Sequence, residues 1–265
     1  MMTTIDLNSD LGEGVATGEL SAEELDDALL AVITSANVAC GGHAGDLRSM
    51  TRICARARDL RVSIGAQVSY VDRAGFGRRR LDIAPDLLTE QLHEQLVALS
   101  SCARAVGTEL RYVKPHGALY NTAADEDDVA LAVIRTILRD ADERGHAIPV
   151  LTLPNSVLAQ MAQQNGVAAY AEGFADRAYT ETGRLVPRSE EGAVIDDPSQ
   201  VQAQVLSMVL TKKLTTMNGS SIDMECASIC VHSDTDGALA LARQLRTALE
   251  DSGIALRPFI DVSNK

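Results

Sequence analysis

Short apolar segments alternate with longer amphipathic segments along almost the whole chain. Strands are predicted at 3–7, 31–39, 62–66, 110–113, 149–153, 167–171 and 227–231. Helices are predicted between them at 21–30, 47–60, 85–106, 125–143, 156–164 and 198–214, and after 234 to 249. A loop-rich insertion is expected at 180–197, a turn at 215–223, and a final strand or packed tail at 254–260. Such sustained alternation predicts parallel strands with helices outside them.

Polar residues follow nearly every predicted strand, and this distribution favours a closed barrel over an open sheet. An open doubly wound sheet would concentrate its polar residues at one switch point. Neither a G-x-G-x-x-G nor a G-x-x-x-x-G-K-[ST] pattern occurs, so a standard nucleotide-binding loop is not predicted. We therefore expect an α/β fold, a (β/α)7-type barrel, in a single domain spanning residues 1–265.

The most distinctive junction is Ser35-Ala-Asn-Val-Ala-Cys-Gly-Gly-His-Ala-Gly-Asp46. An apolar run ends in two glycines, and His43 follows just before a helical pattern begins at Leu47. In α/β folds, ligands bind beyond the carboxyl ends of the strands. His43 is thus a candidate site residue, although a satisfied loop histidine is an equally good interpretation. Cys40 at the end of the apolar run is interpreted as a core residue.

Other predicted strand ends repeat this arrangement of polar side chains. Lys114-Pro-His116 ends one strand, and the remaining candidates at such positions are Asp10, Glu13, Glu172, Asp176, His232 and Asp234. Carboxylates and imidazoles gathered in one barrel mouth suit general acid–base hydrolysis. They also suit a divalent metal holding a water, with Asp10, His43 and His116 as the candidate ligands, but no set is assigned. For Asp10 and Glu13 taken as an isolated pair, capping a helix or bracing a loop is the favoured interpretation.

Basic side chains near these strand ends suit an anionic substrate. Lys114, Arg73, Arg78 and Arg79 are candidates for a carboxylate or phosphate, which arginine binds as a bidentate fork. The candidate substrate-binding residues are Asn8, Arg73, Arg79, Asn121 and Glu172. His93 and His146 lie in or just after helical patterns and are interpreted as surface or packing residues.

Composition narrows the partners and the compartment. The formal net charge of −13 disfavours nucleic-acid and membrane roles, and a small-molecule substrate is expected instead. The five cysteines show no disulfide or zinc-ribbon spacing and are interpreted as reduced thiols. No signal-peptide or membrane-spanning pattern is evident, so a cytoplasmic protein is expected.

Five segments together resemble the LamB/YcsF family, the family of the 5-oxoprolinase A subunit. They are Asp6-Leu-Asn-Ser-Asp-Leu-Gly-Glu13, Ser35 to Asp46, Asp72-Arg-Ala-Gly-Phe-Gly-Arg-Arg79, Val113-Lys-Pro-His-Gly-Ala-Leu-Tyr-Asn121 and Glu172-Gly-Phe-Ala-Asp-Arg-Ala-Tyr179. The resemblance extends from residue 5 to about residue 240.

The resemblance implies a barrel similar to those of glycoside hydrolases and polysaccharide deacetylases. It implies ATP-dependent hydrolysis of 5-oxo-L-proline to L-glutamate, performed with partner subunits B and C. ATP would be handled mainly elsewhere in that complex. In this activity Asp10 and Glu13 would act as acid–base or water-orienting groups. His43 and His116 would activate water or bind metal, and Lys114 would stabilise developing oxyanion charge.

The chain departs from the family pattern at two places. Relatives usually read Gly-Ala-His-Pro-Ser-Tyr-Pro-Asp where this chain has Gly65-Ala-Gln-Val-Ser-Tyr-Val-Asp72, and His-Gly-Asp where it has His232-Ser-Asp234. Gln67 is a poor zinc ligand but can hydrogen-bond a substrate. Two alternatives therefore stay open: a metal-dependent carbohydrate or N-acyl deacetylase or amidohydrolase, and a non-catalytic relative.

Overall fold

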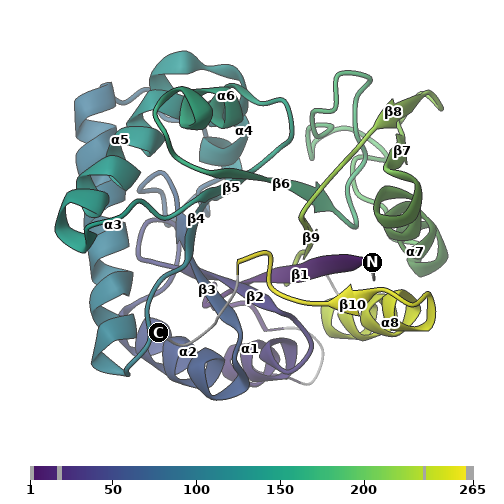
Figure 1. The fold of residues 1–265 in the computed structure, drawn as a ribbon, viewed down its shortest axis with the longest axis horizontal. Coiled ribbons are helices and arrows are strands. Elements are labelled where there is room, and N and C mark those ends of the chain that lie inside the picture. Colours follow the sequence, from purple (N-terminus) through teal and green to yellow (C-terminus); the bar gives the residue numbers. More distant parts are fainter. Residues whose placement is uncertain (1–2, 17–19, 235–236, 261–265) are drawn as a thin grey trace.

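Seven parallel strands close into a barrel in this computed structural model, which describes residues 3–16, 20–234 and 237–260 (Figure 1). The barrel strands are β1 (Thr4–Leu11), β2 (Ser35–Ala39), β3 (Ser63–Val68), β4 (Tyr112–Pro115), β5 (Val150–Thr152), β6 (Ala169–Phe174) and β9 (Ser228–Val231). Each strand pairs with the next, and β9 closes the ring because it pairs with both β6 and β1. The predicted (β/α)7-type barrel is confirmed.

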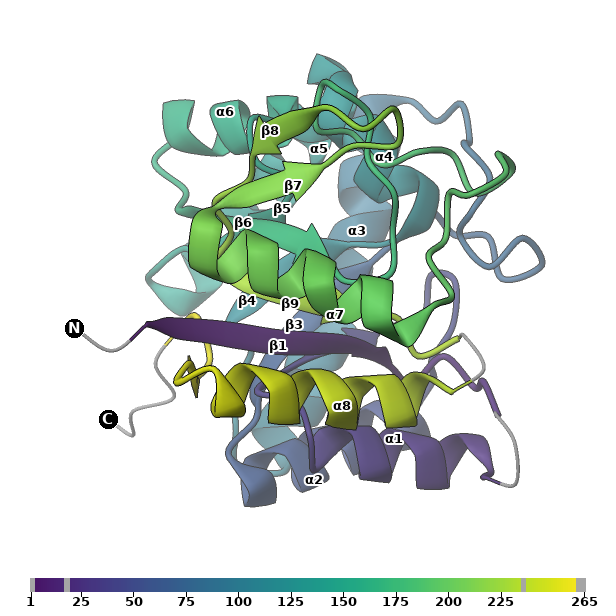
Figure 2. The same ribbon diagram turned by 90° about the vertical axis from the view of Figure 1, so that its right-hand side faces the viewer.

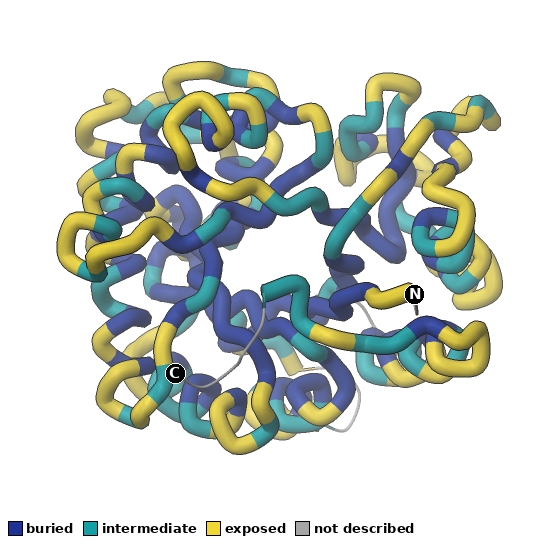
Figure 3. Tube along the Cα trace, in the orientation of Figure 1, coloured by how far each residue is buried: buried dark blue, intermediate teal, exposed yellow. Residues whose placement is uncertain are grey.

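Helices surround this barrel on the outside, as Figures 1 and 2 show. They are α1 (Ala22–Leu30), α2 (Leu47–Leu60), α3 (Pro85–Ala105), α4 (Gly117–Asp125), α5 (Asp127–Arg144), α6 (Val157–Gln164), α7 (Pro198–Leu206) and α8 (Ala238–Asp251). The barrel strands are mostly buried, whereas the outer faces of the helices are exposed (Figure 3). Within the described ranges, no helix is both long and apolar enough to cross a membrane.

The structure differs from the predicted elements at four places. β1 continues to Leu11, and α4 lies almost wholly in a segment where no helix is predicted. The helix predicted at 198–214 is α7 followed by a π-helical turn, η1 (Ser207–Thr211), and it ends where Lys212 takes a left-handed φ of 55°. The predicted turn at 215–223 is an antiparallel hairpin of β7 (Lys213–Thr215) and β8 (Ser221–Asp223). After α8, the short strand β10 (Ala255–Leu256) pairs with β1.

The interior of the barrel is polar, which the apolar appearance of the strands did not predict. Side chains two residues apart on a strand point to the same face. Hydrogen bonds that connect side chains of different strands show which residues point into the barrel. These are Asp6, Asn8 and Asp10 on β1, Ser35 and Asn37 on β2, Tyr112 and Lys114 on β4, and Ser228 and Cys230 on β9. Leu7, Leu11 and Val38 belong to the hydrophobic core instead.

Asp6 forms the end of this polar interior remote from the strand ends that carry the candidate residues. Its carboxylate accepts hydrogen bonds from Thr34 Oγ1 and Ser35 Oγ, both at 2.6 Å, and from Ser228 Oγ. Burial raises the pKa of Asp6 to about 6, although these hydroxyl groups oppose the rise. A carboxyl group with a raised pKa in the folded state stabilises the fold at acidic pH and loses that contribution as the pH rises.

We predict that Asp6→Asn makes the free energy of unfolding less dependent on pH. The wild type should lose stability between about pH 4 and the folded-state pKa of about 6, because only the folded state still binds the proton there. The whole effect is at most about 3 kcal/mol. Urea unfolding at pH 4, 5, 6 and 7 measures it. Equal pH dependence in the two proteins would contradict the prediction.

Candidate active site

The loop after β2 brings His43 over the barrel mouth by a tight glycine turn. The Gly41 amide donates to the Ala44 carbonyl at 2.8 Å, and Gly45 has a left-handed φ of 83°. A Cβ on Gly45 would lie 2.2 Å from the Ala39 carbonyl oxygen, so only glycine fits this close approach. The glycines of this segment therefore place a histidine rather than bind a ligand.

His43 joins Glu13, Gln67 and His116 in one compact group, which we call the imidazole cluster. His43 Nε2 lies 3.1 Å from Glu13 Oε1, and the rings of His43 and His116 stack at 3.7 Å. The Gln67 amide nitrogen is 3.2 Å from the same Glu13 oxygen and 2.9 Å from His116 Nδ1. Four different strand ends thus supply the cluster, as the sequence predicted for Glu13, His43 and His116.

Both ring nitrogens of each histidine in the imidazole cluster are occupied. His116 Nε2 donates to the Phe76 carbonyl at 3.1 Å, so Nδ1 accepts from the Gln67 amide. His43 Nδ1 lies 3.0 Å from Ser69 Oγ, and its Nε2 faces Glu13. Burial and the neighbouring His43 lower the pKa of His116 well below its usual value, consistent with a neutral ring. Neither ring offers a free nitrogen to a substrate.

Lys114 stands at the centre of a second group, the lysine cluster, deeper in the barrel. Its ammonium lies 2.8 Å from Glu172 Oε1, 3.3 Å from Asp10 Oδ1 and 3.2 Å from Cys230 Sγ. Asn8 donates to Glu172 at 2.9 Å and accepts from Asn37 at 2.7 Å. Asn37 also donates to Asp10 at 2.8 Å. Asn8 and Glu172 thus hold the lysine.

Burial and neighbouring charges shift the pKa values of Lys114 and Asp10 in the lysine cluster in opposite directions. Burial opposes the charge of Lys114, but Asp10 and Glu172 raise its pKa well above the ordinary value. Burial would raise the pKa of Asp10, but Lys114 holds it well below the ordinary value. Burial raises the pKa of Glu13, where His43 only partly compensates. The mouth therefore combines a fixed cation, an ionised carboxylate and a carboxyl group that binds a proton more readily.

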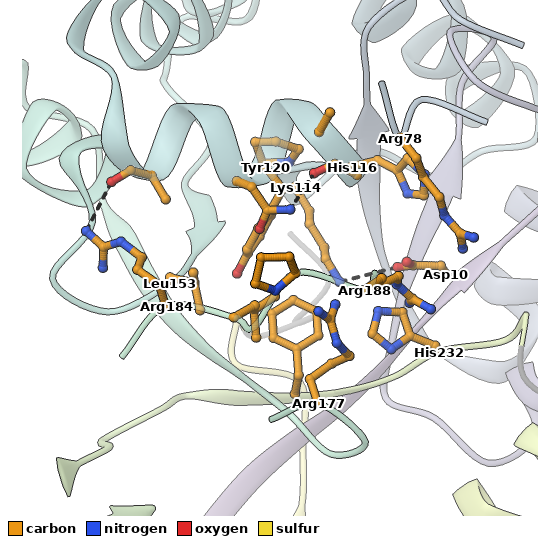
Figure 4. A pocket seen from close by; sticks show the side chains of 18 of the residues that line it. Asp10, Arg78, Lys114, His116, Tyr120, Leu153, Arg177, Arg184, Arg188 and His232 are labelled. Carbon is orange, nitrogen blue, oxygen red and sulfur yellow. Dashed lines mark hydrogen bonds and ion pairs between the residues drawn. The ribbon is translucent and has the colours of Figure 1, made fainter. Parts of the chain in front are cut away.

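A cavity of about 430 Å³ opens over both clusters (Figure 4). Its charged floor includes Asp10, Glu13, Lys114, His116 and His232, and its apolar wall consists of Pro115, Leu153, Phe174, Leu185, Val186 and Pro187. Loop 75–80 reaches it because Gly117, with a φ of 58°, leaves room for the Gly77 carbonyl oxygen, which a Cβ would meet at 2.5 Å.

Four arginines also line this cavity, and the acidic net charge of the chain gave little indication of them. Arg78 and Arg188 both approach Asp234, and Arg184 pairs with Asp125 at 2.6 Å. Arg177 is buried and donates to the Val186 and Ala193 carbonyls. Within the described ranges no ion pair is found for Arg177, and its burial lowers its pKa to about 10. The cavity can therefore bind an anion.

The structure places the predicted substrate-binding residues unevenly. Asn121 lines the cavity from α4, while Asn8 and Glu172 lie beneath it around Lys114. Arg73 is not among the lining residues and donates to the Gly45 carbonyl beside a separate hollow. Arg79 is also outside the cavity, because it pairs with Asp72 through Nε at 3.0 Å. For these two residues, binding a substrate carboxylate in this cavity is not supported by their positions.

Several lining residues were noticed in the sequence without being assigned, or were missed. Arg184 and Arg188 lie in the insertion, where no strand end marks them, and Arg177 follows β6 directly. Tyr120 appears in the fourth motif, and its buried hydroxyl has no hydrogen-bond partner in the described part of the chain. The sequence signal that could have indicated Arg184 and Arg188 is that two arginines occur close together in the insertion of an otherwise acidic chain.

The donor atoms fit a divalent metal poorly. The expected set of Asp10, His43 and His116 is split, since Glu13 groups with the two histidines and Asp10 with Cys230 and His232. Gln67 donates to the Glu13 and His116 acceptors that a metal would need, and Lys114 places a cation beside Asp10 and Cys230. The amide nitrogen of Gln67, rather than its oxygen, faces these two acceptors.

Known proteins resemble the chain over almost its full length. The LamB/YcsF family model matches residues 5–264. The chain belongs to the LamB/YcsF family. It is 49% identical to the 5-oxoprolinase A subunit of Streptomyces griseus, covering 96% of this chain and 99% of that protein. It is 46% identical to a 5-oxoprolinase A subunit of Pseudomonas syringae pv. tomato, covering 97% and 98%.

A solved structure shows the same fold in this family. The lactam utilization protein from Thermus thermophilus superposes with a TM-score of 0.85 at 33% identity, covering 96% of this chain and 99% of that one. The family resemblance carried by the five motifs is thereby confirmed. The two clusters and the arginines are thus part of a LamB/YcsF barrel.

We predict that Lys114→Met destabilises the protein by about 3–5 kcal/mol, because it leaves Asp10 and Glu172 buried without their cation. The loss should be larger at pH 8 than at pH 5, because burial raises the pKa of Asp10 once Lys114 no longer opposes it, and protonation then relieves the uncompensated charge. Urea unfolding measures both. Lys212→Met is the control, since Lys212 and Glu225 are an exposed pair and should change stability by less than about 1 kcal/mol. Equal losses in the two variants would contradict the account.

We predict that Gln67→His raises zinc affinity by about tenfold or more, the scale on which groups around metal ligands act. An imidazole at this position adds a nitrogen donor and removes the amide that occupies Glu13 and His116. Titration calorimetry measures the affinity. Adding His116→Asn to Gln67→His should abolish the gain. Tight, stoichiometric zinc binding by the unchanged chain would refute the interpretation of Gln67.

Proposed function

We propose that the chain is the A subunit of a 5-oxoprolinase, a hydrolase that acts on a cyclic amide. The reaction is ATP-dependent hydrolysis of 5-oxo-L-proline to L-glutamate. The observation that carries this proposal is a buried ammonium group beneath an arginine-lined cavity, in a chain whose relatives are named as 5-oxoprolinase A subunits. The Thermus thermophilus relative is named a lactam utilization protein, and this name supports the same class of substrate.

The cavity matches the two functional groups of 5-oxoproline, a carboxylate and a lactam. Its volume of about 430 Å³ falls within the range of small-molecule sites, roughly 300–1,000 Å³. The arginines suit the carboxylate, as Arg78 and Arg188 reach into the cavity from two different loops. The ammonium of Lys114 suits the lactam carbonyl, whose oxygen gains negative charge when water attacks.

Acid–base groups lie beside this ammonium. Asp10 is held ionised by Lys114 and is suited to orient a water molecule. Glu13 binds a proton more readily than an exposed glutamate, because burial raises its pKa. Such a pair of carboxyl groups with pKa values shifted in opposite directions suits one of them to orient water as a carboxylate and the other to donate a hydrogen bond at neutral pH. His43 and His116 then act by fixing Glu13 and the loop above it.

We further propose that ATP is used together with partner subunits B and C. The chain has no glycine-rich phosphate-binding motif, and its relatives are named as one subunit of an enzyme, which implies a complex. The arginines that line the cavity would also suit a phosphorylated intermediate delivered by a partner. We place the reaction in the cytoplasm, because all five cysteines are unpaired.

The test is coupled turnover by the purified chain with B- and C-type subunits. L-Glutamate should form from 5-oxo-L-proline only when all three subunits and ATP are present. Lys212→Met should leave the rate unchanged, since Lys212 is exposed and lies outside the cavity lining. Arg188→Gln should raise the KM for 5-oxoproline by about tenfold, the scale of one lost charged hydrogen bond.

Three outcomes of this turnover experiment and its controls would contradict the proposal. No glutamate from a well-folded complex would favour a non-catalytic relative. Release of acetate from an N-acetylated sugar by the zinc-loaded chain alone would favour a metal-dependent deacetylase. Glutamate formation without ATP would remove the coupling to the partner subunits.

A further inference from the structure

His232 stands at the end of β9 and faces the cavity beside Asp10 (Figure 4). Its Nδ1 lies 2.8 and 3.1 Å from the two carboxylate oxygens of Asp176. A carboxylate can only accept, and Asp176 is ionised because His232 keeps its pKa below the ordinary value despite burial. In the neutral ring, therefore, Nδ1 carries the proton and Nε2 has a free lone pair.

This arrangement separates His232 from the other two histidines that lie near the barrel mouth. His43 and His116 each have both ring nitrogens occupied within the imidazole cluster. Across the described ranges, no partner is found for Nε2 of His232. Of these three rings, His232 alone offers a nitrogen that can exchange a proton with a cavity ligand.

The surroundings hold the His232–Asp176 pair in place. The His232 ring stacks on Phe174 at 5.4 Å, with 20° between the planes. The turn that carries Asp176 is fixed by the side-chain amide of Gln204, whose nitrogen lies 3.1, 2.9 and 3.0 Å from the carbonyl oxygens of Phe174, Ala175 and Arg177. The Ile195 amide also donates to the Asp176 carbonyl at 2.8 Å. A ring held from these sides is pre-organised for one direction of proton transfer.

We propose that His232 is the residue that transfers the proton during lactam opening, and that Asp176 is its positioning residue. The inference rests on the proposed function and adds a group that the sequence did not assign to catalysis. Asp176 fixes the tautomer, and Phe174 fixes the plane of the ring. Asp10 and Lys114 lie on the same cavity floor.

The proton follows a balanced path, and ATP hydrolysis with the partner subunits supplies free energy for the opening without exchanging this proton. His232 Nε2 takes one proton from a water molecule while the water oxygen bonds to the lactam carbonyl carbon. When the carbon–nitrogen bond breaks, the protonated Nε2 returns that proton to the departing nitrogen. The products are the amino group and the side-chain carboxyl group of glutamate, and His232 regains its starting form.

Several charged groups surround His232. Asp176 contacts it from the end of β6, and Asp10 and Cys230 approach it from β1 and β9. Lys114 lies next to both Asp10 and Cys230, so its positive charge acts on these two groups as well. Among the cavity cations, the Coulombic effect of Arg188 reaches Asp176.

The first measurement reads the tautomer without any partner subunit. In long-range ¹H–¹⁵N spectra of histidine-labelled protein, neutral His232 should show a protonated Nδ1 and an unprotonated Nε2. The signal is assigned by its loss in His232→Asn. A neutral ring that carries its proton on Nε2 would overturn the proposal, whether or not turnover is found.

The second measurement is turnover by the complex with B- and C-type subunits. His232→Asn keeps an amide N–H that can reach Asp176 but has no Nε2, so kcat should fall by roughly 10²–10⁴-fold with a much smaller change in KM. Asp176→Asn should lower kcat and move the acidic limb of the kcat/KM profile to lower pH, because it removes a negative charge next to the ring. His146→Asn, in an exposed loop, is the control and should change neither value.

These outcomes separate the two proposals. An inactive wild-type complex would contradict the proposed function, and the spectra would still decide the state of His232. An active wild type with an equally active His232→Asn variant would contradict the role of His232 alone. An unchanged pH profile in Asp176→Asn would refute the positioning role.

Discussion

The buried ammonium of Lys114 is the interaction on which the rest of the site depends. It is surrounded by Glu172, Asp10 and Cys230. Asn8 binds Glu172, and Asn37 connects Asp10 and Asn8 to one further strand, β2. Removing such a charge from water is costly, and only nearby opposite charges and hydrogen bonds compensate. The barrel supplies them because its inward positions are polar. This network links the ends of β1, β2, β4, β6 and β9, and so helps to set the shape of the cavity above.

Two histidine environments follow from this arrangement. On one wall Gln67 and Glu13 occupy the imidazole cluster, so His43 and His116 are structural supports for the floor. On the other wall Asp176 orients His232, a cavity-lining residue whose second nitrogen has no partner in the described part of the chain. The amide of Gln67 thus has an effect beyond its own position. It hydrogen-bonds to Glu13 and His116 on one wall of the cavity, so we assign proton transfer to His232 on the other wall.

The sequence predicted the barrel, its order of strands and helices, and most of the residues at its mouth, because strand-end chemistry follows directly from alternation. It did not predict the polar interior, although Asp6, Asn8 and Asp10 show the period of two, because Asn8 and Asp10 fall in the loop predicted after a shorter strand. The sequence favoured Arg73 and Arg79 over Arg78 as substrate-binding residues. The conformation of the loop decides which of these neighbouring arginines turns inward, and the sequence pattern does not show that conformation. The occupied nitrogens of His43 and His116 depend on partners far apart in the chain, which spacing cannot show.

A crystal structure of the chain with bound 5-oxo-L-proline tests the central claim most directly. The account predicts the lactam oxygen within hydrogen-bond distance of Lys114 Nζ, the carboxylate on the arginine side of the cavity, and His232 Nε2 facing the reacting carbon. The cavity is large enough to admit the molecule without rearrangement of the barrel. Substrate bound outside this cavity, or bound inside it with the lactam directed away from Lys114, would contradict the account.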